Sequence, residues 1–264
     1  MPSKTITLTT DFGLKDPYVA EMKAVILGIS PKAKIVDITH KIEKFNIRTG
    51  AYTLAAACPY FPKGTIHVAV VDPGVGTKRK AILIQTKTAC FIGPDNGVLA
   101  LAAKGQGIRH VYRIENPKFM LPRISNTFHG RDIFAPAAAH LANGTSPSEF
   151  GSEIPEIVTP KFAKITKTKT ILTGEVIHID GFGNIITNLR EKDLKSMDIE
   201  KTVNLKIKDT MLKLKLCKAY SEVDAQQPLV IIGSHNFLEI SVNQGNAAEN
   251  LQTRVGDKVT LYYL

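Results

Sequence analysis

The sequence has no tryptophan and only three cysteines. Cys58, Cys90 and Cys217 lie far apart in the chain, each in a largely apolar stretch. An odd number of scattered cysteines does not form a disulfide framework, and cysteines in such surroundings usually act as small core side chains. We therefore expect a protein without disulfide bonds, of the kind found in the cytoplasm.

Long apolar runs are also absent, since no stretch approaches the ~20 residues that a membrane-spanning helix needs. Met1–Lys4 is followed directly by a predicted strand and not by the apolar segment of a signal peptide. The sequence has no P-loop, no complete GxGxxG fingerprint and no GxSxG elbow. Its histidines lack HExxH or other paired spacing. We therefore expect neither membrane insertion nor a metal site.

The remaining composition is that of a globular protein, with 44% hydrophobic and 22% charged residues. A chain of 264 residues favours two domains. The formal net charge of +10 makes nucleic-acid binding a competing hypothesis. The lysines are spread out, however, and those at 206, 208, 213 and 215 alternate along two predicted strands and so face solvent. We therefore favour a solvated basic surface without nucleic-acid binding.

The first half of the sequence alternates between strand-like and helix-like patterns. Runs of β-branched residues predict strands, and apolar residues at helical spacing predict helices. Asp16 and Pro17 are expected to start the first helix, as its N-cap and first helical residue. The alternation indicates βαβ units and a mainly parallel sheet. The predicted strands are 5–10, 34–38, 65–71, 81–86, 89–92 and 109–114, and the predicted helices are 17–29, 46–60, 96–104 and 132–143.

After about residue 150 the pattern changes to short strands. Pro155, Pro160 and the Lys/Thr-rich stretch 161–169 separate the halves. Many short strands with closely spaced turn signals indicate a small barrel or sandwich. We expect an α/β domain over residues 1–155, a linker over 156–170 and an all-β, barrel-like domain over 171–264.

Polar residues follow the predicted strands of the first half. The third strand runs into Asp72 and a Pro/Gly-rich loop carrying Arg79, while Asp11 and Asp37 lie at similar strand ends. Ligands of open α/β sheets bind beyond the carboxyl ends of the strands. His129, just before a predicted helix, is a further candidate. Each residue alone is compatible with an ordinary turn or cap, but their recurrence favours a small-molecule site of carboxylates, one arginine and one histidine.

A second polar group lies in the β-rich half. Asp180 ends a predicted strand and is followed by a glycine-flanked Phe182 and by Asn184. An aromatic face and a paired amide donor and acceptor suit a nucleobase. A tight hairpin with Phe182 in the core explains the same pattern. The turn around Ser234 is likewise either ordinary or the polar lining of a pocket.

Taken together, these residues resemble one family, the S-adenosyl-L-methionine (SAM) hydroxide adenosyltransferases, which are SAM hydrolases related to the fluorinases and chlorinases. The resemblance implies that water cleaves SAM at the ribose 5′ carbon to give adenosine and L-methionine, with no cofactor besides this substrate. It also implies a homotrimer with the ligand between the N-terminal domain of one subunit and the C-terminal domain of its neighbour. The motifs that carry it span nearly the whole chain and are Thr9–Gly13, Asp37–His40, Val71–Gly76, Gly93–Gly97, Thr127–Asp132 and Ile179–Asn184.

The resemblance also implies roles for single residues. Asp72, Arg79 and His129 occupy the positions that hold the attacking water, and which of them takes the proton stays open. The substrate positions are Asp11 at the ribose diol, Phe45 beside the ribose, Asp180 and Ser234 at the methionine ammonium, Asn184 at the adenine, and Phe182 and Tyr220 for aromatic packing.

Three differences favour the hydrolase branch over the halogenases. The halogenases resemble this chain but have Tyr in place of Asp72, a Tyr-Ser pair in place of His129–Gly130, and an insertion where Gln85–Ile92 is short. A carboxylate in a dry site also repels a halide. The alternatives are a halogenase-like transferase and a SAM- or adenosine-binding protein without catalysis. A methyltransferase is disfavoured because no glycine-rich loop follows the first strand.

Overall fold

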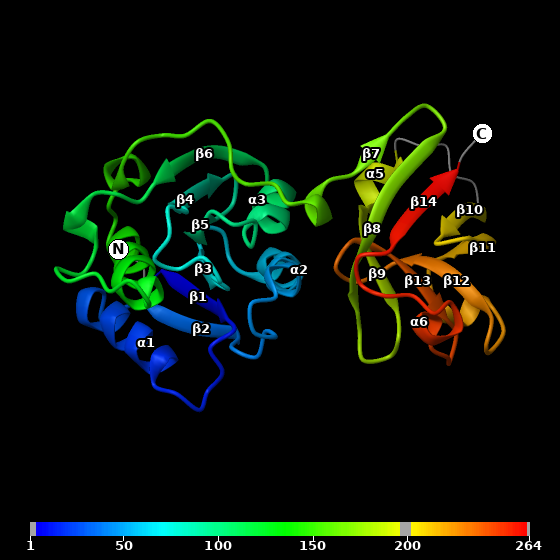
Figure 1. Cartoon of the computed structure of the whole chain (residues 1–264), viewed down its shortest axis with the longest axis horizontal. Helices are drawn as coiled ribbons and strands as arrows, with labels where there is room; N and C mark the ends of the chain where they lie inside the picture. Colours follow the sequence, from blue (N-terminus) through cyan, green and yellow to red (C-terminus); the bar gives the residue numbers. More distant parts are fainter. Residues whose placement is uncertain (1–3, 196–201, 263–264) are drawn as a thin grey trace. The chain divides into compact units, whose positions relative to one another are not determined.

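The computed structural model describes residues 4–195 and 202–262, which form two compact units (Figure 1). The N-terminal unit is Met1–Pro160 and the C-terminal unit is Lys161–Leu264. The short strand β7 (Thr166–Lys167) lies within the stretch expected as a linker, and it pairs with β8 of the C-terminal unit. The described residues include no helix that is both long and apolar enough to cross a membrane.

The N-terminal unit is built on a six-stranded sheet with the order β2-β1-β3-β5-β4-β6. β2, β1, β3 and β5 run parallel, whereas β4 is antiparallel to β5 and β6. The mainly parallel sheet predicted from the sequence is therefore confirmed, and the carboxyl ends of its four parallel strands lie along one edge. The bounds are β1 Thr5–Thr10, β2 Lys34–Thr39, β3 Ile66–Val70, β4 Ala81–Thr86, β5 Cys90–Pro94 and β6 Ile108–Arg113.

Helices cover both faces of this sheet (Figure 1). α1 (Tyr18–Ile29) packs against α4 (Ala135–Ala142), and α2 (Ile47–Ala57) packs against α3 (Ala100–Gln106). The expected cap of α1 is wrong. Pro17, and not Asp16, is the N-cap, because the Pro17 carbonyl accepts the first helical hydrogen bond from the Glu21 N–H at 2.9 Å.

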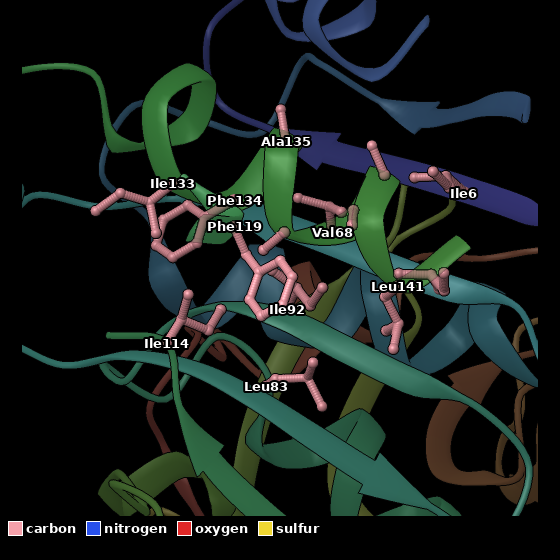
Figure 2. Close-up of a cluster of buried hydrophobic side chains, with 14 of the residues drawn as sticks. Ile6, Val68, Leu83, Ile92, Ile114, Phe119, Ile133, Phe134, Ala135 and Leu141 are labelled. Atoms are coloured by element: carbon pink, nitrogen blue, oxygen red, sulfur yellow. The ribbon is translucent and has the colours of Figure 1, made fainter. Parts of the chain in front are cut away.

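The main core of the N-terminal unit lies between the sheet and the helices α1 and α4. Side chains alternate along a strand, so Ile6 and Val68 face this core while Thr7 and His67 face the opposite side and hydrogen-bond each other at 2.8 Å. Figure 2 shows the aromatic and aliphatic side chains that the segment before α4 adds above the strands. The core residues labelled in Figure 2 are Ile6, Val68, Leu83, Ile92, Ile114, Phe119, Ile133, Phe134, Ala135 and Leu141.

The C-terminal unit is a closed barrel of seven strands. The strand order is β14-β10-β11-β12-β13-β9-β8, and the pairing of β14 with β8 closes the ring. The barrel-like domain predicted from the sequence is confirmed. Its bounds are β8 Ile171–Ile179, β9 Ile185–Arg190, β10 Thr202–Ile207, β11 Thr210–Cys217, β12 Pro228–Ile232, β13 Phe237–Val242 and β14 Lys258–Tyr262, with two short helices, α5 Glu191–Lys195 and α6 Ala247–Asn250.

Candidate active site

An ion pair lies just beyond the carboxyl end of β3. Asp72 follows this strand, and the loop after it turns back so that Arg79 Nε lies 3.0 Å from both Asp72 carboxylate oxygens. Arg79 Nη2 donates to Asp72 Oδ2 at 2.5 Å. The Asp72 and Arg79 side chains are only 4% and 10% exposed, so the pair is largely shielded from water. A two-nitrogen contact of this kind fixes the plane of both groups.

His129 joins this pair through the same arginine nitrogen. Arg79 Nη2 lies 2.7 Å from His129 Nδ1. An arginine nitrogen only donates, so Nδ1 must accept, and the proton of the neutral imidazole sits on Nε2. Burial and then the charge of Arg79 lower the pKa of His129 below its ordinary value, against a weaker opposing effect of Asp72. The imidazole is therefore neutral near pH 7 and presents an N–H donor.

Close approach of two loops brings Arg79 and His129 together. Gly76 has a φ of +76°, and a Cβ there would collide with the carbonyl oxygen of Asn126. Only glycine combines this backbone conformation with such a contact. The side chain of Asn96 also donates to the Val71 carbonyl at 2.8 Å, which holds the end of β3 and leaves α3 to begin at Ala100 instead of at residue 96 as predicted.

Asp11 and Phe45 form a second group at the same sheet edge. Asp11 is buried and its Oδ2 accepts the Phe45 backbone N–H at 2.8 Å. Phe45 has a φ of +65°, and the residue is 67% exposed. An exposed ring on a strained residue, fixed by a buried carboxylate, is available to pack on a ligand. Asp37, by contrast, lies inside β2, where it pairs with Lys23 at 2.6 Å and does not join the cluster.

The C-terminal unit holds the other predicted residues in the β8–β9 turn. Asp180 Oδ1 accepts the backbone N–H groups of Phe182 and Asn184, both at 2.9 Å. Its Oδ2 accepts the Asn184 amide at 2.9 Å. Phe182 is 81% exposed as a residue, so its ring does not pack in the core of this unit. Asp180 thus shapes a turn that leaves Phe182 exposed and holds the buried Asn184 amide in place.

A buried carboxylate that the sequence analysis missed accompanies this turn. Glu239 lies on β13, and Tyr220 donates its hydroxyl to Glu239 Oε2 at 3.4 Å. Burial and then the charge of Asp180 raise the pKa of Glu239 above its ordinary value. Gly233 makes room for this carboxylate, since a Cβ there would collide with it. Ser234 follows in the exposed β12–β13 turn. The available signal was a single acidic residue within a mostly apolar strand.

The structure therefore gathers the predicted residues into two groups, one in each unit. Asp72, Arg79 and His129 are joined by hydrogen bonds, with Asp11 and Phe45 at the same sheet edge. Asp180, Phe182, Asn184, Tyr220 and Ser234 belong to the C-terminal unit. Within residues 4–195 and 202–262, no group of three His, Cys, Asp or Glu side chains is placed to hold a metal ion.

Comparison with known families decides the relationship. The SAM hydroxide adenosyltransferase N-terminal domain matches residues 6–151, and the C-terminal domain of the same family matches residues 174–260. The chain belongs to the SAM hydroxide adenosyltransferase family.

Relatives within and around this adenosyltransferase family match nearly the whole chain. A protein of Methanocaldococcus jannaschii named (R)-S-adenosyl-L-methionine hydrolase is 41% identical, over 98% of this chain and 95% of its own length. A Thermus thermophilus protein of the same name is 36% identical, over 98% and 99%. A fluorinase of an Actinoplanes species is 27% identical, over 97% and 96%.

Two solved structures share the fold of this chain. An uncharacterized conserved protein from Thermotoga maritima superposes with a TM-score of 0.84 at 41% identity, covering 97% of this chain and 99% of that chain. A conserved hypothetical protein from Thermus thermophilus superposes with a TM-score of 0.77 at 35% identity, covering 98% and 99%. The α/β sheet followed by a barrel is thus an architecture shared with both proteins.

Proposed function

We propose that this protein is an enzyme that hydrolyses SAM at the ribose 5′ carbon, giving adenosine and L-methionine. The observation that carries the proposal is the shielded cluster of Asp72, Arg79 and His129 beyond the carboxyl end of β3. Relatives at 34–41% identity named (R)-S-adenosyl-L-methionine hydrolase support the same reaction.

The reaction needs a positioned water more than a strong acid. The water oxygen forms a bond to C5′ while the C5′–S bond breaks. The electron pair of the broken bond stays on sulfur, so methionine leaves as a neutral thioether. Water loses one proton in the process. Holding the water oxygen in line behind C5′ can lower the activation barrier by up to ~7–11 kcal/mol. Removing the proton with a positioned base adds roughly 10²–10⁴-fold.

The cluster divides these tasks by the hydrogen-bonding capacity of each group. Among the described residues, Arg79 Nη1 and His129 Nε2 have no hydrogen-bond partner, and both are donors. These two N–H groups would hold the water oxygen and stabilise its negative charge as the proton leaves. The single lone pair of the neutral His129 ring, at Nδ1, already accepts from Arg79, whereas the Asp72 carboxylate has lone-pair capacity beyond the Arg79 contacts. We therefore assign Asp72 as the base.

Substrate binding would use the two other groups of residues. In the N-terminal unit, Asp11 would accept from the ribose hydroxyls and Phe45 would pack on the sugar. In the C-terminal unit, Asn184 would read the adenine edge, Phe182 and Tyr220 would pack on its ring, and Asp180 and Ser234 would hold the methionine ammonium. We propose that no further cofactor takes part.

We also propose a cytoplasmic homotrimer that binds neither nucleic acid nor membrane, in which units of neighbouring subunits complete each site. Light scattering gives the subunit number. Mixing the Asp72→Asn variant with the Asp180→Ala variant tests the shared site, because a mixed assembly would contain some sites with both residues intact. Recovered activity supports the arrangement, and a monomer at working concentration rejects it.

Incubation with SAM alone tests the reaction. Adenosine and methionine are expected, and in ¹⁸O-labelled water the new adenosine 5′-hydroxyl should carry the label. Because the relatives' names specify an (R) form, the two sulfonium epimers are assayed separately. If SAM stays unchanged, the result would favour the alternative, a SAM- or adenosine-binding protein without catalysis. A 5′-halogenated nucleoside formed with added halide would instead support the halogenase-like transferase.

A further inference from the structure

The most deeply buried carboxylate near the cluster belongs to a residue that the mechanism does not use. Asp132 is 0% exposed. It lies in Gly130–Phe134, a π-helical turn that leads into α4, three residues after His129. π-Helical turns are rare and frequently accompany functional sites. The position of Asp132 therefore calls for a role beyond packing.

The Asp132 carboxylate organises the loop that leads to His129. Its Oδ2 accepts the Ser125 backbone N–H at 2.7 Å. Ser125 Oγ in turn accepts the Phe128 N–H at 3.0 Å, and the Asp132 N–H donates to the Phe128 carbonyl at 3.1 Å. The carbonyl of the residue before His129 is thus fixed directly by Asp132, and its N–H is fixed through Ser125, which Asp132 holds.

Arg131 locks this carboxylate in place. Arg131 Nε donates to Asp132 Oδ1 at 2.7 Å, and Nη1 donates to Glu21 of α1 at 2.8 Å. The Arg131 guanidinium also lies 5.0 Å from the centre of the Phe128 ring, within the range of a cation–π contact. The loop is therefore held by ionic, aromatic and backbone contacts at once.

The same loop touches the loop that carries Arg79. Asn126 follows Ser125, and its carbonyl oxygen lies against Gly76 so closely that no side chain fits there. A shift of residues 125–128 would therefore displace His129 and the Gly76 loop together. The 2.7 Å contact between Arg79 Nη2 and His129 Nδ1 depends on the positions of both loops.

We infer that Asp132 is a positioning residue that sets the orientation of His129 toward Arg79, through Ser125 and Phe128. This inference rests on the proposed function for its catalytic consequence. Asp132 acts through His129 and does not contact SAM. The Asp132→Asn variant keeps the size of the side chain but turns an amide N–H₂ group toward Arg131 or Ser125, where two donors would oppose each other.

Kinetics with SAM give the first test. Asp132→Asn should lower kcat by about 10–100-fold, the cost of misplacing a reacting group by an ångström or less, while KM changes little. In a His129→Ala background the same substitution should lower kcat by a clearly smaller factor, because His129, the group that Asp132 positions most directly, is already gone and only the shift of the Gly76 loop remains. Equal losses in both backgrounds, or full activity of Asp132→Asn, would overturn the inference.

Nitrogen NMR of the imidazole gives a second test that needs no turnover. The wild type should show His129 as a single Nε2–H tautomer, whereas Asp132→Asn should show a mixture. An unchanged tautomer in the variant would refute the positioning role. If the wild type failed to cleave SAM while this spectral change appeared, the proposed function would fail and the positioning role would stand.

Two further variants control for folding. Glu149→Gln is the matched control, since the Glu149 carboxylate also accepts a serine backbone N–H, that of Ser146 at 2.9 Å, in a loop of the same unit. It should leave kcat and the His129 tautomer unchanged. Ser125→Ala removes the acceptor of the Phe128 N–H but keeps Asp132, so it tests the same path if Asp132→Asn does not fold. A wild-type tautomer and kcat in Ser125→Ala would count against the path.

Discussion

Replacing Arg79 by methionine tests whether the cluster is as shielded as its geometry indicates. Methionine keeps much of the length of the side chain but removes the charge and every donor. It would leave Asp72, whose side chain is 4% exposed, without its cationic partner. Removing one partner of a buried ion pair costs about 3–5 kcal/mol, because the remaining charge stays desolvated. The loss of the contact with the Phe134 ring, 5.3 Å from the guanidinium, acts in the same direction.

The expected result is a large fall in thermal stability. A unit of this size loses about 2–4 °C of Tm per kcal/mol, so Tm of the N-terminal unit should fall by roughly 6–20 °C. Differential scanning calorimetry measures the fall, and amide hydrogen exchange in β1 and β3 assigns the transition. The double variant Asp72→Asn/Arg79→Met should recover most of the loss, because it removes the unpaired charge.

An exposed pair supplies the matched control. Arg113 and Glu115 lie 3.3 Å apart with side chains 50% and 40% exposed, so Arg113→Met should cost at most about 1 kcal/mol. If Arg79→Met were no more destabilising than Arg113→Met, the Asp72–Arg79 pair would be solvated. The water-holding arrangement argued from its shielding would then be refuted.

Three further predictions concern single residues. Gly76→Ala should lower kcat at least about tenfold, measured by product formation, and stability by about 1–3 kcal/mol, measured by urea unfolding. Gly64 also has a positive φ, +85°, but has open space around it, so Gly64→Ala should lower stability and leave kcat unchanged. Burial lowers the pKa of His67 from 6.5 to about 4, so the folded unit binds fewer protons than the unfolded one between these pH values. Its stability should therefore fall by about 3 kcal/mol as pH drops through this window, and calorimetry should find a smaller fall in His67→Asn. Because the pKa of Glu239 is raised in the folded unit, ionising this carboxylate lowers the folding stability above pH 4.5, the ordinary pKa of the unfolded state. Glu239→Gln should therefore raise the unfolding midpoint of the ligand-free C-terminal unit at pH 7. An unchanged midpoint would mean that the carboxylate is well solvated.

Local patterns in the sequence were enough to predict the architecture. β-Branched runs and helical spacing located the strands and helices because these depend on nearby residues, and the parallel edge followed from their alternation. The position of Asp72 at the end of β3 could be predicted for the same reason.

Contacts between distant segments could not be predicted in the same way. Asp37 looked like a strand-end residue, but β2 continues to Thr39. The Asp37 carboxylate pairs with Lys23 instead of joining the cluster. Glu239 was missed because its partner Tyr220 is 19 residues away in the sequence, and a single carboxylate within a strand is weak evidence for a site. Asp132 was seen only as part of a motif, since its contacts run backwards to Ser125 and sideways to Arg131.

The closed ring of strands in the C-terminal unit limits how that unit can associate. A sheet with free edges can extend by adding a strand from another chain, which is a common route to both assembly and aggregation. Here β14 and β8 satisfy each other's backbone groups, and the flanking strand β7 is only two residues long. Any partner of the barrel must therefore be recognised by side chains and turns, so substitutions on its surface should alter association without competing for backbone hydrogen bonds.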